Sequence, residues 1–324
     1  MNPAPANLGT ALLTRREFLH HATIATAAVA TAGAPAGAAG LSVTPPVPDA
    51  IIVDIHVHCT HRGRTDDAVL VHQRNTGVTI SILLPAGTTG GLAAGAAGSA
   101  HVVTLAQRHP DRFRFCANEN VFRENAAREI ERQLRLGAVG IGELKDAGAC
   151  DSREMARVAE VAREFDVPML IHFQDGSYND GFARFHRILE KFPTVRFIAH
   201  AQTFWANIDA AYETKQGLRP TGPVKPGGLS DRWLADYPNF YGDLSAGSGN
   251  GALMRDVGFT KDFLHRHQDK LLYGSDCPCP TGFGPTCLAL AKLAFLRDHA
   301  ASETVRTKIL SGNARRIYQR LARA

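Results

Sequence analysis

Residues 51–58 read Ile-Ile-Val-Asp-Ile-His-Val-His, an apolar run that ends in two histidines separated by one residue. In a β-strand, residues two positions apart point to the same face, so His56 and His58 can bind one metal ion. Both lie at the C-terminal end of the run, and an α/β barrel builds its active site at that end of its strands. The stretch therefore predicts the first strand of a barrel that carries a metal site.

Seven further apolar stretches follow, most of them short and rich in β-branched residues, as expected of parallel strands covered on both faces. They span 78–84, 112–117, 138–143, 167–172, 195–200, 239–245 and 270–275. Amphipathic helical patterns separate several of them, with good examples at 125–136, 152–165 and 182–192. Eight strands with intervening helices predict a single-domain (β/α)8 TIM barrel over residues 50–324.

Two longer connections are expected near the mouth of this barrel. The Gly- and Ala-rich stretch 87–100 follows the second strand and predicts a flexible loop. The insert 202–237 follows the sixth strand and carries Trp205, Trp233 and several Pro and Gly residues. We expect this insert to form a lid or one wall of a pocket.

The N-terminus has the features of an export signal. Thr14-Arg-Arg-Glu-Phe-Leu19 is a twin-arginine pattern, and an Ala-rich apolar stretch and cleavage sites of the A-x-A type follow it. We interpret residues 1–36 as a twin-arginine signal peptide and 37–49 as a linker. The apolar stretch is shorter than the roughly 20 residues of a membrane helix, so no stable span is expected after cleavage. The protein is predicted to be bacterial and periplasmic or secreted.

Composition excludes some classes of partner. The formal net charge is +5, but the basic residues are scattered and form no dense Lys/Arg block, so neither nucleic acid nor an anionic membrane is expected as a partner. The six cysteines match no Cys-only zinc pattern, and their disulfide status stays open. Cys59 and Cys277 directly follow candidate ligands, and we interpret them as packing or supporting residues.

Polar residues end most of the later predicted strands, in the same sense as the two histidines of the first. Glu143 and Lys145 end the fourth strand, His172 the fifth, His200 the sixth, Asp243 and Ser245 the seventh, and Asp276 the eighth. A single histidine at a strand end is commonly a hydrogen-bonded core residue. Four histidines and Asp276, all at the same ends of apolar strands, indicate one shared site.

The motifs together resemble the amidohydrolase superfamily, and within it the amidohydrolase-related branch (amidohydrolase family 2) that also contains decarboxylases. The matching stretches are DIHVH at 54–58, IH at 171–172, AH at 199–200, NFYGDLS at 239–245, YGSDCP at 273–278 and ILSGNARRIY at 309–318. The resemblance covers nearly the whole chain after the linker. It implies a (β/α)8 barrel, a catalytic divalent metal that is most often zinc, and an activated water.

The resemblance also assigns roles to individual residues. His56, His58, His172 and Asp276 match metal ligands, and Asp276 is also the expected general base. His200 is either a ligand of a second metal or the group that polarises the substrate. Asp54 is expected either to orient an imidazole or to make a structural hydrogen bond.

The fourth strand leaves the number of metals at one or two. Glu143 resembles the glutamate that bridges two metals in some branches of the superfamily. Lys145 stands where other branches have a carbamylated lysine, but a salt bridge or a contact to a substrate carboxylate is the expected role.

These expectations predict a metal-dependent hydrolase that cleaves an ester, lactone or amide of a small molecule. Two alternatives stay open: a metal-dependent non-oxidative decarboxylase of an aromatic or unsaturated acid, and a catalytically silent binding protein. Candidate substrate-binding residues are Lys145, Trp205 and Arg64. The sequence identifies neither the substrate nor the metal, and homo-oligomerisation is left open.

Overall fold

The computed structural model describes residues 51–88 and 95–322. The predicted signal (1–36), the linker (37–49) and part of the 87–100 loop therefore lie outside the described residues. Within those ranges eight strands run parallel, each beside its neighbour in chain order. They are β1 Val53–Val57, β2 Ile80–Leu83, β3 Phe113–Phe115, β4 Ile141–Leu144, β5 Met169–His172, β6 Phe197–His200, β7 Phe240–Asp243 and β8 Leu271–Leu272.

The strands close into a ring, which confirms the predicted TIM barrel. Ala117, just after β3, forms a parallel bridge with Ile141 of β4. At the other junction the Ile55 amide donates to the Tyr273 carbonyl over 3.1 Å, and the Asp276 amide donates to the His56 carbonyl over 2.8 Å. The second of these bonds brings Asp276 beside the first strand.

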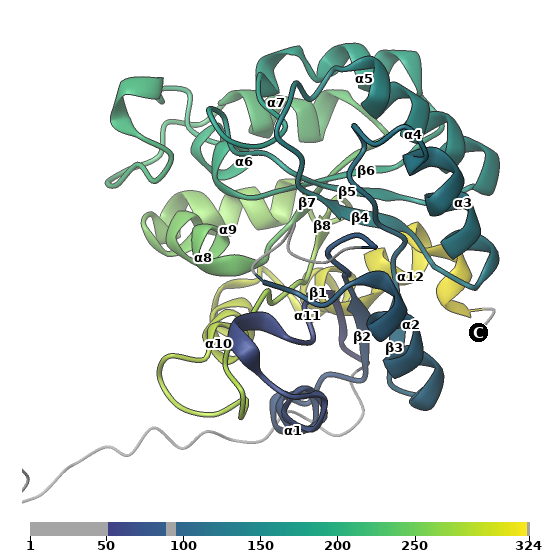
Figure 1. Cartoon of the computed structure of the whole chain (residues 1–324). Helices are drawn as coiled ribbons and strands as arrows, with labels where there is room; N and C mark the ends of the chain where they lie inside the picture. Colours follow the sequence, from purple (N-terminus) through teal and green to yellow (C-terminus); the bar gives the residue numbers. More distant parts are fainter. Residues whose placement is uncertain (1–50, 89–94, 323–324) are drawn as a thin grey trace, which may run out of the picture. The chain divides into compact units, whose positions relative to one another are not determined.

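Helices surround the barrel (Figure 1). They are α1 Asp66–Thr76, α2 Ser99–Arg108, α3 Ala126–Arg135, α4 Arg153–Phe165, α5 His186–Lys191, α6 Gln202–Ala206, α7 Leu229–Asp236, α8 Ala246–Met254, α9 Val257–Arg266, α10 Leu288–His299, α11 Glu303–Thr307 and α12 Asn313–Ile317. Short helical turns are η1 His61–Gly63, η2 Phe182–Arg184, η3 Thr214–Gln216, η4 Lys308–Gly312 and η5 Gln319–Ala322.

Local sequence sets several helix starts. The side chains of Thr65, Ser152, Asp256 and Ser302 each accept a hydrogen bond from an amide in the first turn of the helix that follows, which satisfies a donor that has no partner inside the helix. The predicted helices at 125–136 and 152–165 agree with α3 and α4 to within one residue at each end. The predicted helix at 182–192 instead divides into η2 and α5, where buried Phe182 and Phe185 follow the three-residue spacing of a tighter helix.

The N-terminal end of the barrel is filled by side chains. Ile317, Tyr318 and Leu321, from the C-terminal helices, pack with Leu170 and Ile198 of the strands in one buried cluster. Leu170 and Ile198 precede His172 and His200 by two residues, so each pair points to the same side of the sheet. The histidines therefore lie one layer further toward the C-terminal end of the barrel.

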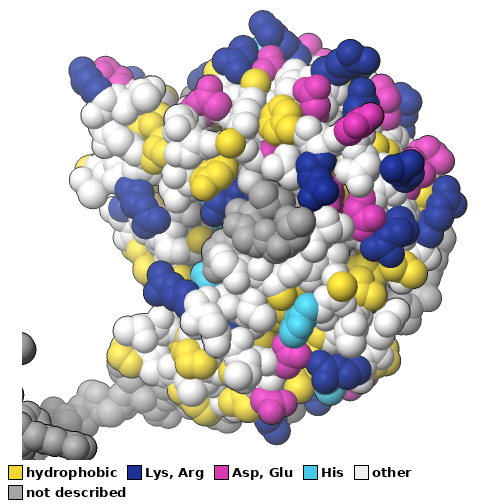
Figure 2. Space-filling model, viewed as in Figure 1, with side chains coloured by type: hydrophobic (Ala, Val, Ile, Leu, Met, Phe, Trp, Pro, Cys, Tyr) yellow, Lys and Arg dark blue, Asp and Glu magenta, His cyan; other side chains and the backbone are white. Residues whose placement is uncertain are grey.

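The insert after β6 contains α6, η3 and α7, and the segment between α6 and α7 projects away from the barrel (Figure 1). Its Trp233 packs its ring against Phe182 and Phe240. No helix in the described ranges is long and apolar enough to cross a membrane. Figure 2 shows Lys and Arg side chains interspersed with Asp and Glu over one face.

Candidate metal centre

Six predicted site residues come together at the C-terminal end of the barrel. His56, His58, Glu143, His172 and His200 are all buried, and the side chain of Asp276 is 18% exposed. The parallel register places His172 directly beside His200. Asp276 is therefore the member of the set with the most open access to a ligand.

One group of donor atoms comes from the two ends of the sequence. The Nε2 atoms of His56 and His58 lie 3.2 Å apart. Asp276 Oδ1 lies 3.9 Å from the first and 3.8 Å from the second. These three side chains can hold a metal ion between them.

A second group comes from the middle strands, and Glu143 connects the two. Glu143 Oε1 lies 2.5 Å from His172 Nδ1 and 3.6 Å from His200 Nε2. Its other oxygen, Oε2, lies 3.1 Å from His58 Nε2 and 3.6 Å from His56 Nε2. Each carboxylate oxygen of Glu143 therefore faces a different pair of histidines.

The outer nitrogens of the first two histidines fix their tautomers. His56 Nδ1 lies 2.7 Å from Asp243 Oδ2, and His58 Nδ1 lies 2.9 Å from the Leu84 carbonyl oxygen. Both partners only accept hydrogen bonds, so both Nδ1 atoms carry the proton. When both rings are neutral, as metal binding requires, their Nε2 lone pairs point toward each other.

The other two histidines are arranged in the same way. His172 Nε2 lies 3.1 Å from the amide oxygen of Gln174, which leaves the Nδ1 lone pair facing Glu143. His200 Nδ1 lies 2.9 Å from Ser245 Oγ and 3.3 Å from Asp243 Oδ2, which leaves the Nε2 lone pair facing inward. Four imidazole lone pairs and the carboxylates of Glu143 and Asp276 thus converge.

These inward-facing atoms fit a divalent metal. Lone pairs and carboxylate oxygens repel one another at such distances unless a cation or added protons lie between them. Asp276 Oδ1 is buried and has no hydrogen-bond partner within the described part of the chain. Neutral imidazole and carboxylate are suitable ligands for zinc and other divalent transition metals.

Two supporting residues had no assigned role in the sequence. Asp243 accepts the hydrogen bond from His56 Nδ1, and Ser245 Oγ lies between Asp243 Oδ2, at 2.8 Å, and His200. Burial opposes ionisation of Asp243, but the adjacent His56 and His200 hold its pKa below its usual range. The NFYGDLS stretch marked both as strand-end polar residues, but only the contacts show that they orient two ligands.

His61 is a further neighbour that the sequence did not single out. Its Nδ1 lies 3.5 Å from Asp276 Oδ1. Burial lowers the pKa of His61 to about 4 even though Asp276 opposes the shift, so its ring is neutral at pH 7. The sequence signal for His61 was a third histidine three residues after His58. In a loop, this spacing alone does not predict that the two side chains share a face.

Other ionisations agree with a metal-binding state. Burial lowers the pKa of His200, which keeps it neutral and able to act as a ligand. Burial also opposes the charge on Glu143, but in the metal-free protein the adjacent His172, with His56 and His58, holds its pKa well below its usual range. Glu143 is therefore a carboxylate at neutral pH.

The predicted substrate-binding residues lie in different places. Lys145 Nζ lies 5.1 Å from the centre of the Tyr178 ring, whose own centre lies 5.7 Å from that of His172. Lys145 is thus close to the metal centre through Tyr178.

Arg64 is buried and donates to the backbone carbonyls of His58, Cys59, Cys277 and Cys279. These bonds tie the loop after β1 to the loop after β8. The guanidinium therefore supports the two segments that carry His58 and Asp276.

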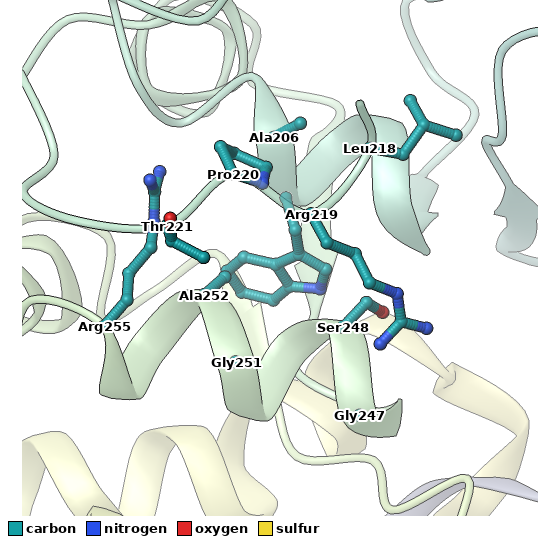
Figure 3. A pocket seen from close by; sticks show the side chains of 11 residues that line it. Ala206, Leu218, Arg219, Pro220, Thr221, Gly247, Ser248, Gly251, Ala252 and Arg255 are labelled. Carbon is teal, nitrogen blue, oxygen red and sulfur yellow. The ribbon is translucent and has the colours of Figure 1, made fainter. Parts of the chain in front are cut away.

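Trp205 lines a cavity of about 170 Å³ between α6, α8 and residues 218–221. Figure 3 shows the Arg219 guanidinium beside Ser248 in this cavity. The Trp205 Nε1 atom is buried and has no hydrogen-bond partner among the described residues.

Asp54 joins β1 to the segment after β8. Its Oδ1 accepts hydrogen bonds from the His56 amide over 3.1 Å and from the Ser275 amide over 2.8 Å. Burial raises the pKa of Asp54 to about 6. Of its two expected roles, the contacts show the structural one.

Comparison with known families identifies the chain. A family model described as amidohydrolase matches residues 53–320. The chain belongs to the amidohydrolase family. This confirms the family resemblance of the strand-end motifs. It also makes the protein a metal-dependent enzyme of that family, with a buried cluster of His, Glu and Asp at the expected end of its barrel.

Solved structures share the barrel of this amidohydrolase at low sequence identity. An uncharacterised TIM-barrel protein from Bordetella bronchiseptica superposes with a TM-score of 0.60 at 16% identity, over 84% of this chain and 99% of the other. A probable 2-pyrone-4,6-dicarboxylic acid hydrolase from Acinetobacter baumannii, with citric acid bound, gives a TM-score of 0.57 at 12% identity, over 84% of this chain and 99% of the other.

A 2,6-dihydroxybenzoate decarboxylase complexed with 2,6-dihydroxybenzoate gives a TM-score of 0.53 at 15% identity, over 83% of this chain and 99% of the other. These likenesses show the fold alone. A search of the curated proteins finds no significant match to the sequence.

Proposed function

We propose that this amidohydrolase hydrolyses an ester, lactone or amide bond of a small molecule at a centre where Glu143 would serve as a ligand to two zinc ions. The observation that carries the proposal is the position of Glu143, whose two oxygens face two separate pairs of histidines. A carboxylate that served one ion would direct both oxygens, or one, to a single group of ligands.

The ligand sets support two sites with room for substrate. His56, His58 and Asp276 with Glu143 Oε2 would hold one ion, and His172 and His200 with Glu143 Oε1 would hold the other. The second set has three protein ligands, the number typical of catalytic zinc sites with an open position. The tautomer of His200 makes it a ligand rather than a hydrogen-bond donor to substrate, because its proton is on Nδ1 beside Ser245.

Zinc bound at these residues supplies Lewis-acid chemistry that lowers the pKa of a water from about 16 to near 7 and polarises a carbonyl. Asp276 accepts the proton of the attacking water and later passes it to the leaving group. Its partial exposure gives it access to both partners. Asp243 and Ser245 keep His56 and His200 in the tautomers that bind metal.

Lys145 supports a substrate that carries a carboxylate. Its ammonium group lies over Tyr178, at the side of the centre formed by His172. The same cation favours a second candidate function, non-oxidative decarboxylation of an aromatic acid. The chain shares its fold with the 2,6-dihydroxybenzoate decarboxylase, and this fold is compatible with that reaction. Ligands for two ions favour hydrolysis, since a two-metal site would supply positioning of a water as well as of the substrate.

The two reactions are separated by their products. We would incubate the zinc-loaded enzyme with esters, lactones and amides, each with and without a carboxylate, and with hydroxylated aromatic acids. Hydrolysis predicts a new carboxylic acid from the first group and no carbon dioxide from the second. Release of carbon dioxide without hydrolysis would replace the proposal by decarboxylation. A Lys145→Met variant should raise KM for the carboxylated substrates and leave KM for the uncharged ones unchanged.

A further inference from the structure

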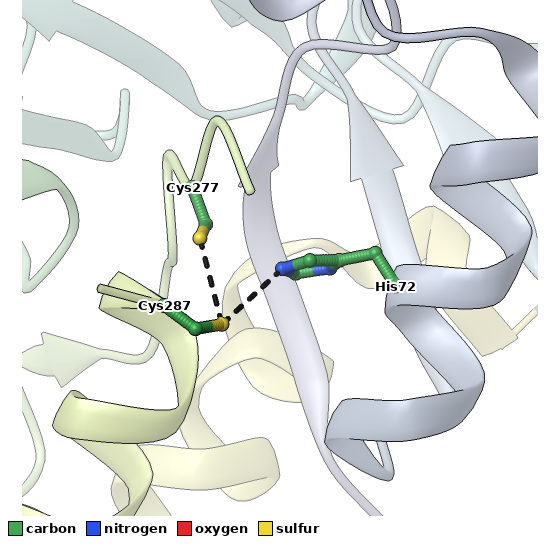
Figure 4. Close-up of side chains that lie close together, drawn as sticks. All are labelled: His72, Cys277 and Cys287. Atoms are coloured by element: carbon green, nitrogen blue, oxygen red, sulfur yellow. Dashed lines mark hydrogen bonds between the residues drawn. The ribbon is translucent and has the colours of Figure 1, made fainter. Parts of the chain in front are cut away.

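Outside the barrel mouth, three soft donor atoms converge in the protein interior. His72 comes from α1, Cys277 from the loop after β8, and Cys287 from the residue that precedes α10. Figure 4 shows their side chains pointing toward one another from these three elements. The exposed fractions are 4%, 1% and 1%, so the group is closed to solvent.

The distances within the group match those of metal ligands. Cys277 Sγ lies 3.8 Å from Cys287 Sγ, which lies 3.8 Å from His72 Nε2, and all three atoms are within 4.8 Å of one another. A tetrahedral zinc ion with bonds of about 2.3 Å to sulfur and about 2.0 Å to nitrogen separates two sulfurs by about 3.8 Å and sulfur from nitrogen by about 3.5 Å. A disulfide would need about 2.05 Å, so the two thiols are not bonded to each other.

We propose that His72, Cys277 and Cys287 bind a thiophilic d10 cation, taken here as Zn²⁺, at a three-ligand site separate from the catalytic centre. Two sulfurs and an imidazole favour such ions over Mg²⁺ or Ca²⁺, which prefer oxygen ligands. Binding of Zn²⁺ releases the two thiol protons to solvent, and the resulting thiolates balance the charge of the ion. The site is therefore neutral, which suits its burial and the nearby Arg64 guanidinium that donates to the Cys277 carbonyl.

The site would stabilise the loop that carries the predicted base. Cys277 directly follows Asp276, and Cys287 closes the same loop ten residues later. An ion held here joins this loop to α1 and to the start of α10. It would thereby fix the backbone next to Asp276.

Cobalt substitution tests this site by absorption spectroscopy and needs no measurement of enzyme activity. The catalytic centre offers only nitrogen and oxygen ligands, so a near-ultraviolet thiolate-to-cobalt charge-transfer band can come only from cysteine. We expect Co²⁺-loaded wild type to show the band. The Cys287→Ser variant should lose the band and about one metal ion per chain, and the His72→Gln variant should at least weaken it. Cys150→Ser is the matched control, since Cys150 is also buried but donates only to the Gly181 carbonyl.

Each other result overturns the proposal. Absence of the band in folded, cobalt-loaded wild type excludes thiolate ligation, whatever the variants do. A band of unchanged intensity in Cys287→Ser would place the thiolate elsewhere. A mass two protons lower in the isolated protein, with Cys277 and Cys287 in one cross-linked peptide, would identify the pair as a disulfide.

Discussion

At the scale of single residues, the inward lone pairs of four histidines determine the chemistry of the barrel mouth. The HxH spacing predicted two of them, and the strand-end positions predicted the other two. Asp243, Ser245 and His61 received no role from the sequence. Nothing in the chain distinguishes a carboxylate that binds a metal from one that orients a ligand, because that distinction depends on which ring nitrogen it contacts.

Asp276 tests the proposed base. The Asp276→Asn substitution keeps the side-chain shape but removes the proton acceptor, and we expect kcat to fall by about 10²–10⁴-fold. Circular dichroism and the metal content serve as controls for folding and loading. A variant that keeps its metal and retains kcat within about tenfold of the wild type would show that another group accepts the proton.

His56 makes metal binding pH-dependent. In the metal-free protein burial opposes its positive charge, but Asp276 and Asp243 raise its pKa well above the usual range, so the ring is protonated at neutral pH. A metal binds only the neutral ring, so binding must release this proton. We expect the apparent affinity to rise with pH from about 6 to about 8. Calorimetry in buffers of different ionisation enthalpy should detect the released proton; no release would contradict this account.

At the scale of elements, alternating patterns predicted every strand of the described barrel and the positions of α3 and α4. The same patterns overextended the strands by one to three residues at several ends. A strand ends where its backbone hydrogen bonds to the neighbouring strand stop, and residue type alone does not mark that point. Residues 182–192 show the same limit, since two buried phenylalanines three apart fit either helix type.

The α7–α9 contact offers a stability test away from the site. Asp231 on α7 receives hydrogen bonds from His267 Nε2 over 2.6 Å and from Arg266 Nη1 over 2.7 Å. Because Asp231 is buried, its replacement by asparagine removes the negative charge that faces these groups and one of the two acceptor oxygens. We expect Asp231→Asn to lower the free energy of unfolding by about 3 kcal/mol, measured in urea. Asp298→Asn, at an exposed pair with Arg297, should change it by less than about 0.5 kcal/mol.

The pH dependence of the same contact has a defined sign. Burial opposes the charge on Asp231, but hydrogen bonds from His267 and Arg266 lower its pKa below the usual range. A carboxylate whose pKa is lower in the folded state contributes stability above its unfolded pKa of about 3.9 and loses it as the pH falls. The wild type should therefore lose stability between about pH 5 and the acid limit more steeply than Asp231→Asn. If the wild type and Asp231→Asn lost stability equally steeply as the pH fell, this role of Asp231 would be contradicted.

At the scale of the whole molecule, we propose that residues 1–36 direct export through the twin-arginine pathway. The proposal rests on the Arg15-Arg16 pair and the Ala-rich stretch that follows. Replacing both arginines with lysine should retain the precursor in the cytoplasm, whereas the wild type should appear shortened in the periplasm or medium. Export of the double variant at the wild-type level would contradict the proposal. Twin-arginine export carries folded proteins, which would allow metal to be loaded before transport.

Glu143 is proposed to serve as a ligand to two metal ions, and the metal content of the protein tests this role most directly. We would measure zinc per chain in Cys287→Ser protein, which removes the proposed thiol site, with and without the added Glu143→Ala substitution. We expect about two zinc ions per chain, falling to about one or none when Glu143 is removed. About one ion per chain, unchanged by the Glu143 substitution, would contradict the bridged centre and favour the decarboxylase alternative.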